Sequence, residues 1–337
     1  MNNFRLKRRK FIWGLMGLSG AYFSNNCGAF SAQLKSVEMQ GMGEILADST
    51  MQIWFNQYYL INSHLQLKYH SVYNTDFLIN RLSRGRVDFV FYNALLNQNS
   101  FNVLDKNLIT FDIGLRAIAL IYNNQELANL KITKNQLHDI FTGKIQDWQE
   151  LGAVTSKPIK LIYQGNNNNT NLALTRYLNT TNIYDKNQME KGKVFPWKKG
   201  IKARSNQGII STVEQIDGGI SYVEYPFVDK DLVSVATIEN NYGNFVTPHS
   251  NQSVFVMNYH DLNEDKNNNY KYPLMVINQI LINKNNLNKT KISALKDFVE
   301  WTINYNENLS SQEYLNHISL PSYLVEKNKL KIEQYLS

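Results

Sequence analysis

Cysteine is nearly absent from this sequence: Cys27 is the one cysteine among 337 residues. A chain with a single thiol cannot form an internal disulfide bond. Cys27 lies in the N-terminal leader described below, where it is either a lipid-attachment site or is removed with the leader. A lipoprotein signal normally has leucine three residues before its cysteine, and Ser24 stands there. We therefore favour removal, which leaves a mature chain without thiols.

Recognisable catalytic and metal-binding motifs are also missing. The sequence has no Gly-x-Ser-x-Gly elbow and no His-x-x-x-His pair, and its histidines are scattered. An alternation of Asp and Asn over residues 261–267 resembles the start of a calcium loop. Lys266, however, replaces the glycine that the loop needs, and Tyr272 replaces its closing acid. We predict no catalytic residue, no metal site and no cofactor.

The net positive charge is small beyond the first ten residues. The net charge is +7, and five basic residues lie in that short segment before any acidic residue occurs. The remainder therefore carries +7 − 5 = +2. This is too little for a face that follows a phosphate backbone, so we expect no nucleic-acid partner.

Long hydrophobic runs are absent as well. The basic start is followed by an apolar stretch over residues 11–23 and then by small residues, which is the layout of a signal peptide. The apolar stretch is shorter than the roughly 20 residues that cross a bilayer. We predict a signal peptide over residues 1–31 and a periplasmic or extracellular protein. Arg8 and Arg9 resemble a twin-arginine leader, so that route and general secretion both remain open.

The sequence does contain short apolar runs that alternate with helical patterns, as is typical of α/β proteins with a mainly parallel sheet. Strands are predicted at Leu65 to Tyr69, Val87 to Tyr92, Ala117 to Tyr122 and Ile159 to Tyr163. Helical faces are predicted around Met51 to Tyr58 and Phe77 to Leu82, and Ser293 is expected to cap a C-terminal helix.

One polar loop, over residues 164–170, lies between a predicted strand and a predicted helix. Its sequence is Gln-Gly-Asn-Asn-Asn-Asn-Thr, and Thr170 or a neighbouring asparagine is well placed as the helix N-cap. A helix start presents free N–H groups and the positive end of the helix dipole. The loop could therefore hold an anion or a carbonyl-rich ligand, and ordinary capping is the alternative.

Five segments then occur in a recognisable order. They are Gly41-Met42-Gly43, residues 86–96, Ile140-Phe141-Thr142-Gly143-Lys144-Ile145 up to Trp148, residues 219–225, and residues 273–284 with the terminal helices. In this order they resemble the PstS-like periplasmic phosphate-binding proteins of ABC importers, over nearly all of the chain after the leader. The resemblance implies the two-lobed type II periplasmic binding protein fold, an α/β fold with a mixed, mainly parallel sheet in each lobe and crossover hinge strands. It implies lobe 1 at residues 32–114 plus 279–337, and lobe 2 at residues 115–278.

The resemblance also implies a set of ligand-binding positions. These are Ile45, Leu46, Asn74, Thr75, Asn93, Gln164, Asn168, Asn169 and Thr170. Asn93 stands where the family has an acid that accepts a proton from the anion, and Gln164 stands where it has an arginine. Both charges are therefore gone. An amide does not repel a fully ionised oxyanion as a carboxylate does, so discrimination against sulfate should weaken.

We therefore expect a divergent PstS-like protein that binds phosphate or a related small oxyanion and delivers it, as a monomer, to an ABC permease in the inner membrane. The polar positions also suit a small neutral ligand. A sensory, adhesive or scaffold protein that kept the fold but changed or lost its ligand is the alternative. No residue pattern supports an enzyme.

Overall fold

The architecture is taken from a computed structural model, which describes residues 36–44, 48–72, 77–95, 107–165, 169–179, 200–248, 272–308, 320 and 322–336. The predicted signal peptide, with Cys27, lies outside the described residues. The helices are α2 (Asp48–Ile61), α3 (Leu78–Ser83), α4 (Lys134–Thr142), α5 (Asn169–Asn179), α6 (Asn206–Gln215), α7 (Lys289–Asn308) and α8 (Ser322–Leu336), with short 3-10 turns η2 (Trp148–Leu151), η3 (Tyr225–Phe227) and η5 (Lys284–Asn286). The strands are β1 (Val37–Glu44), β2 (Leu65–Val72), β3 (Phe89–Leu95), β4 (Leu108–Tyr122), β5 (Lys131–Ile132), β6 (Lys160–Gln164), β7 (Ile201–Ala203), β8 (Gly219–Glu224), β9 (Ser234–Val235), β10 (Thr237–Glu239), β11 (Phe245–Val246) and β12 (Met275–Asn283).

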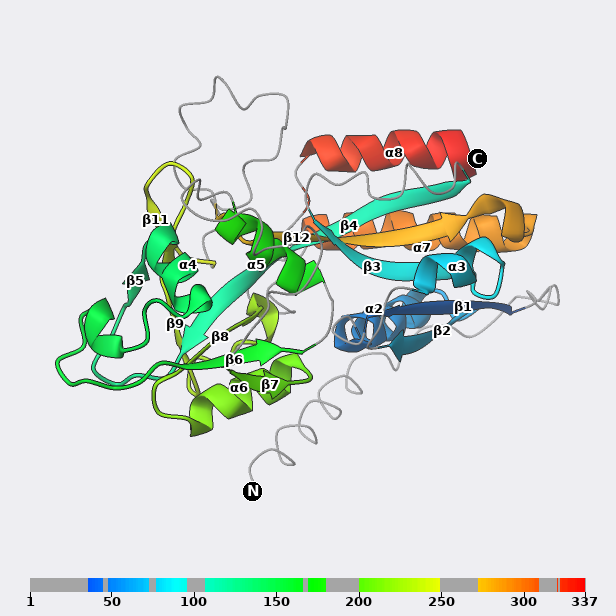
Figure 1. The fold of residues 1–337 in the computed structure, drawn as a ribbon. Helices are drawn as coiled ribbons and strands as arrows, with labels where there is room; N and C mark the ends of the chain where they lie inside the picture. The colour runs from blue at the N-terminus through cyan, green and yellow to red at the C-terminus, as the bar shows by residue number, and fades with distance from the viewer. Residues whose placement is uncertain are drawn as a thin grey trace, which may run out of the picture. The chain divides into compact units, whose positions relative to one another are not determined.

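Within the described residues, nine strands form a mixed sheet in the order β2-β1-β3-β12-β4-β8-β6-β7, with β9 added beside β4 (Figure 1). The pairs β1–β2, β1–β3, β6–β7 and β6–β8 are parallel. The pairs that involve β4 and β12 are antiparallel. Two parallel groups of strands are thus joined through β12 and β4. Strands β5, β10 and β11 form a separate small sheet.

The two joining strands together link the parallel groups. Strand β12 pairs with β3 on one side and β4 on the other, and β4 continues along the sheet to pair with β8. Their shared register shifts between Asn278 and Gln279. The predicted lobe boundaries, at 114/115 and 278/279, fall inside these two strands and remain predictions.

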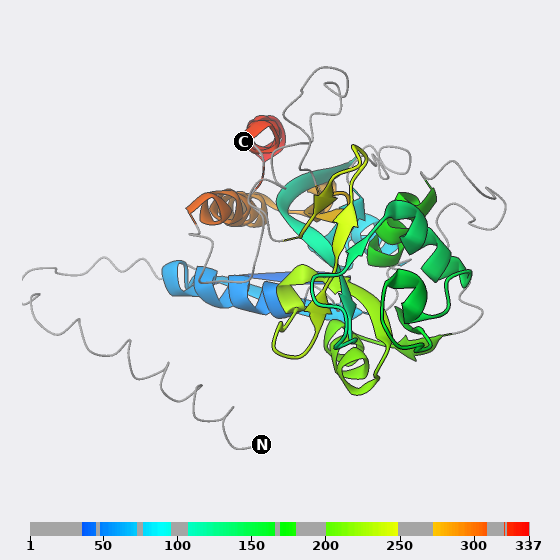
Figure 2. The ribbon, with the colours of Figure 1, turned by 90° about the vertical axis from the view of Figure 1, so that its left-hand side faces the viewer.

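Aromatic packing holds the first parallel group against its helices. Phe55 and Tyr58 of α2 contact Phe298 of α7 with ring centroids 5.8 and 5.2 Å apart. Helix α7 also lies against β1 and β4, and α8 packs beside it, as the turned view in Figure 2 shows. A smaller cluster around Leu78 and Leu281 places α3 against β3 and β12. These contacts bury the apolar faces that the helical patterns predict.

The segment of the resemblance from Ile140 to Trp148 forms the end of α4 and the turn that follows. Thr133 and Gln136 form a capping box at the start of α4, and Gly143 ends the helix at φ 77°, a left-handed conformation that glycine adopts without strain. The indole of Trp148 is buried and donates from Nε1 to the carbonyl of Gly218 at 2.9 Å. This bond joins the segment to the residue that immediately precedes β8.

Two local predictions need correction. Helix α7 begins at Lys289, so Ser293 lies inside it and does not cap it. Asn288 instead accepts from the backbone N–H of Lys291 at 2.9 Å, as an N-cap side chain does. Strand β4 begins at Leu108, well before the predicted Ala117. Charged Asp112 and Arg116 interrupt its apolar pattern, but both are buried and have partners in the fold.

Candidate functional site

The carboxyl ends of β1, β2 and β3 lie at one edge of the sheet, because these strands run parallel. Ligands of open α/β sheets bind outside this edge. The predicted positions Ile45, Leu46, Asn74 and Thr75 follow the ends of β1 and β2 and lie outside the described residues. Asn93 lies near the end of β3, where its backbone pairs with Asn278 of β12.

A second set of predicted positions gathers where β6 meets α5. Gln164 is the last residue of β6 and is buried, and Asn169 and Thr170 are the first two residues of α5. Helix α5 begins at Asn169, so Thr170 is part of the helix and is not its N-cap, which corrects that option. The asparagines before the helix, residues 166–168, lie outside the described residues, so capping by one of them stays a prediction. Helix α5 packs against β3 and β12, so the fold brings the start of this helix and the strand of Asn93 into one neighbourhood.

The start of α5 combines two features that suit an anion. The first N–H groups of a helix have no partner within it, and the helix dipole is positive there. In addition, the Thr170 hydroxyl is buried and has no hydrogen-bond partner among the described residues. A buried hydroxyl without a partner costs free energy, so its presence at a helix start is a sign of function.

Asn171 holds this helix start in place. Its Nδ2 donates to the backbone carbonyl of Gln164 at 3.0 Å, and its Oδ1 accepts from the Tyr222 hydroxyl of β8. Burial raises the pKa of Tyr222 above its ordinary value, so the phenol stays protonated and keeps donating. One buried side chain thereby links α5, β6 and β8.

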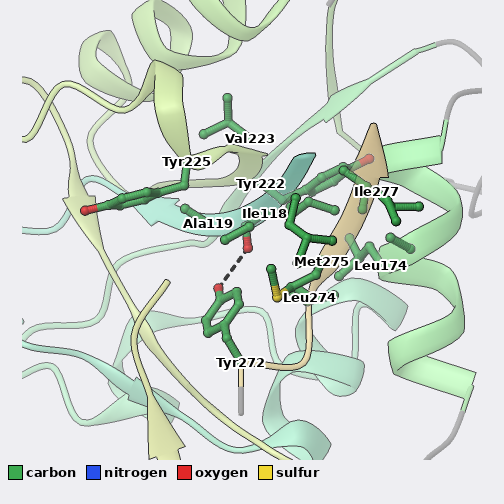
Figure 3. Close-up of a cluster of buried hydrophobic side chains, with 14 of the residues drawn as sticks. Ile118, Ala119, Leu174, Tyr222, Val223, Tyr225, Tyr272, Leu274, Met275 and Ile277 are labelled. Carbon is green, nitrogen blue, oxygen red and sulfur yellow. Dashed lines mark hydrogen bonds between the residues drawn. The ribbon is translucent and has the colours of Figure 1, made fainter. Parts of the chain in front are cut away.

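An apolar cluster lies along the same helix, and Figure 3 shows Leu174 of α5 in it with Ile277 of β12 and Tyr222 of β8. Tyr272, which comes before β12 in the chain, donates its hydroxyl to the backbone carbonyl of Ile118 at 2.8 Å. The cluster gives the helix start a rigid support.

Sequence reasoning missed several polar residues that the fold buries. Asn278 of β12 and Asn206, the first residue of α6, have side-chain amides without a hydrogen-bond partner among the described residues. Arg116 and Glu224 form a fully buried ion pair. Asn278 could have been noticed in the sequence, because it is a polar residue within the mostly apolar stretch 275–282. The pairing of Arg116 with Glu224 could not, because it depends on the strand order.

The described residues contain no group of three or more His, Cys, Asp or Glu side chains that could hold a metal ion. In the same part of the chain, no helix combines the length and apolar character required to cross a bilayer.

Comparison with known protein families shows which superfamily this chain belongs to. A model of the PBP superfamily domain matches residues 33–306. The chain belongs to the PBP superfamily. This PBP superfamily protein is 22% identical over 312 residues to the phosphate-binding protein PstS of Xylella fastidiosa strain 9a5c, a match that covers 88% of the chain and 85% of the relative. It is 25% identical over 242 residues to the phosphate-binding protein PstS of Haemophilus influenzae, covering 66% and 72%.

Solved structures share the fold of this PBP superfamily protein. A high-affinity periplasmic phosphate-binding protein, PfluDING, matches with a TM-score of 0.66 at 15% identity, over 88% of this chain and 94% of that one. An ABC-type phosphate transport receptor from Vibrio cholerae matches with a TM-score of 0.56 at 15% identity, over 78% and 93%. The predicted two-lobed periplasmic binding protein fold and the PstS-like resemblance are confirmed.

Proposed function

We propose that this protein is an exported solute-binding protein that binds phosphate or a related small oxyanion and delivers it, as a monomer, to an ABC permease of the inner membrane. The curated PstS relatives, which match over most of the chain, support a solute-binding role and do not favour the sensory, adhesive or scaffold alternative. The proposal includes removal of residues 1–31 on export and a periplasmic or extracellular location.

The observation that carries the proposal is the arrangement at the end of β6. Buried Gln164 ends the strand, the buried Thr170 hydroxyl lies in the first turn of α5, and Asn171 ties the two together. Helix N–H groups and neutral amides can hold a dehydrated anion, because their dipoles satisfy its oxygens without a counter-charge.

The proposed site differs from a charged one in its expected affinity. A charge-assisted hydrogen bond contributes about 1.5–3 kcal/mol, so glutamine in place of arginine at position 164 weakens anion binding by roughly tenfold to a hundredfold. Amide in place of carboxylate at position 93 also removes a repulsion that rejects fully ionised anions. We therefore propose a binding protein of moderate affinity and broad oxyanion selectivity.

A thermal-shift titration of the exported, processed protein tests this proposal. Phosphate, sulfate and arsenate are each added at millimolar concentration, and the new N-terminus is sequenced to test leader removal. A ligand present at 1,000 times its Kd stabilises the folded state by about 4 kcal/mol, which raises Tm by several degrees. If no oxyanion raises Tm, the proposed ligand class is wrong and the non-transport alternative gains support.

Two threonines of α5 provide a matched pair of variants. Thr170→Val removes the buried hydroxyl at the helix start, whereas Thr175→Val removes a hydroxyl that donates to the Asn171 carbonyl at 2.8 Å, one turn further on. We expect Thr170→Val to reduce the phosphate-induced shift and Thr175→Val to retain it. An equal phosphate-induced shift of Tm in the two variants would argue against a site at the helix start.

A further inference from the structure

Asn278 is a polar residue in the middle of a buried apolar strand. Its side chain is 0% exposed, and it lies in β12 between Ile277 and Ile280, both of which are also buried. Neither its Nδ2 nor its Oδ1 has a hydrogen-bond partner among the described residues. Each polar group left without a hydrogen bond in the interior destabilises the fold by about 1–3 kcal/mol. The presence of asparagine at this buried position therefore needs an explanation.

The other polar side chains of β12 have hydrogen bonds, which sets Asn278 apart. Gln279 donates from Nε2 to Asp112 at 2.6 Å. Asn283 accepts from the backbone N–H of Asn285 at 3.1 Å and so caps the turn that follows the strand. The polar side chains that follow the register shift in β12 therefore have partners, whereas the amide of Asn278, just before the shift, has none among the described residues.

The strand register places Asn278 beside Asn93, one of the predicted ligand-binding positions. Asn278 lies directly opposite Asn93 on β3 and directly opposite Gly114 on β4. Residues opposed in an antiparallel ladder point to the same face of the sheet, with Cβ atoms about 4.5–5.5 Å apart. Asn93 and Asn278 therefore occupy facing positions in the ladder, and Gly114 adds no side chain on the other side of Asn278.

The local geometry of β12 is also characteristic of a binding position. The register with β4 shifts immediately after Asn278, and such irregularities are over-represented beside active sites, where they redirect a side chain. Ile277 belongs to the apolar cluster with Leu174 (Figure 3). Val276, two residues before Asn278, is buried in the same cluster, so the apolar core extends along β12 up to Asn278.

We propose that Asn278 contacts the ligand and that, with Asn93, it forms an uncharged two-amide subsite for an oxygen of the oxyanion. This inference rests on the proposed function and deepens it. An amide can both donate and accept, so the pair can bind a protonated or an ionised oxygen. Asn278 thereby contributes to the broad selectivity that the absence of a carboxylate at position 93 predicts.

Calorimetric titration with inorganic phosphate, together with the melting temperature of the ligand-free protein, tests the inference. Asn278→Leu keeps the approximate volume of the side chain and removes both polar atoms, and Asn278→Ala covers the case in which leucine does not fit. We expect phosphate affinity to fall at least tenfold in both variants. We also expect the ligand-free Tm of Asn278→Leu to stay level or rise, because an unsatisfied buried amide has been removed.

Gln279→Leu is the matched control, since it removes the neighbouring amide, which already has a partner in Asp112. We expect this control to lower Tm and to keep phosphate affinity. If wild-type protein binds phosphate and the Asn278 variants bind it equally well, the inference fails while the proposed function stands. A merely structural role for Asn278 would lower Tm and leave affinity unchanged. If wild-type protein binds no phosphate, sulfate or arsenate, the proposed function fails and the inference fails with it.

Discussion

Arg116 of β4 and Glu224, the last residue of β8, form an ion pair in which both side chains are completely buried. The guanidinium carbon of Arg116 also lies 6.0 Å from the centroid of the Phe227 ring. Strand β4 pairs with β12 up to Ala117 and with β8 from Ile118 onward. The ion pair therefore lies where β4 changes its pairing from one parallel group of strands to the other, and it keeps a buried cation next to a balancing anion.

Removing one member of this pair should be strongly destabilising. Glu224→Gln leaves the buried charge of Arg116 uncompensated, which typically costs about 3–5 kcal/mol. Urea denaturation measures the loss. The double variant Arg116→Met/Glu224→Leu should recover most of it, because well-packed apolar residues commonly replace a buried ion pair at little cost. A loss below about 1 kcal/mol in the single variant would show that the pair is not a critical contact.

The hydroxyl of Tyr222 should matter for both stability and ligand binding. Tyr222→Phe removes the donor to Asn171 Oδ1, at a cost of about 1–3 kcal/mol, and loosens the first turn of α5. We expect a lower Tm and weaker phosphate binding. Tyr122→Phe is the control, because it removes a buried hydroxyl that donates to the Leu127 carbonyl, on another strand. The control should lose stability and keep affinity; a loss of affinity in both variants would contradict a specific role for the α5 anchor.

Acid should destabilise the turn that Asp147 organises. The backbone N–H of Gln149 donates to its carboxylate, as do the Ser156 hydroxyl and the Lys157 N–H, and these bonds hold the pKa of Asp147 below its ordinary value. Because the folded-state pKa is the lower one, the unfolded chain takes up this proton first as pH falls. The contribution is present above about pH 4 and is lost as pH drops through the folded-state pKa. Thermal melts between pH 7 and pH 3 should therefore fall more steeply for wild type than for Asp147→Asn; parallel curves would contradict the assignment.

Restoring a carboxylate at position 93 should narrow ligand selectivity. Asn93→Asp places a negative charge near the end of β3, where it repels fully ionised sulfate and accepts a hydrogen bond from the protonated oxygen of hydrogen phosphate. We expect the ratio of phosphate to sulfate affinity to rise at least tenfold in calorimetric titrations at neutral pH. Asn93→Ala should lower the affinities for phosphate and sulfate to a similar degree. An unchanged ratio in Asn93→Asp would place the bound anion away from β3.

Much of the fold follows from local patterns. The apolar runs predict β2, β3 and β6 to within a few residues, and the aromatic face around Trp54 predicts α2. The pattern fails where burial depends on distant partners. The first half of β4 contains Asp112, whose carboxylate accepts from Gln279 and whose backbone N–H donates to Asn328, so no local signal marks it as a buried strand.

Hydrophobic periodicity and helix-start chemistry are local properties, so the alternation of strands and helices and the polar loop at the end of β6 can be predicted from the amino-acid order alone. Two relationships appear only in the folded chain: Asn278 lies opposite Asn93, and Arg116 pairs with Glu224. These residues are far apart in the chain, and strand order and register, which depend on the packing of the whole sheet, bring them together.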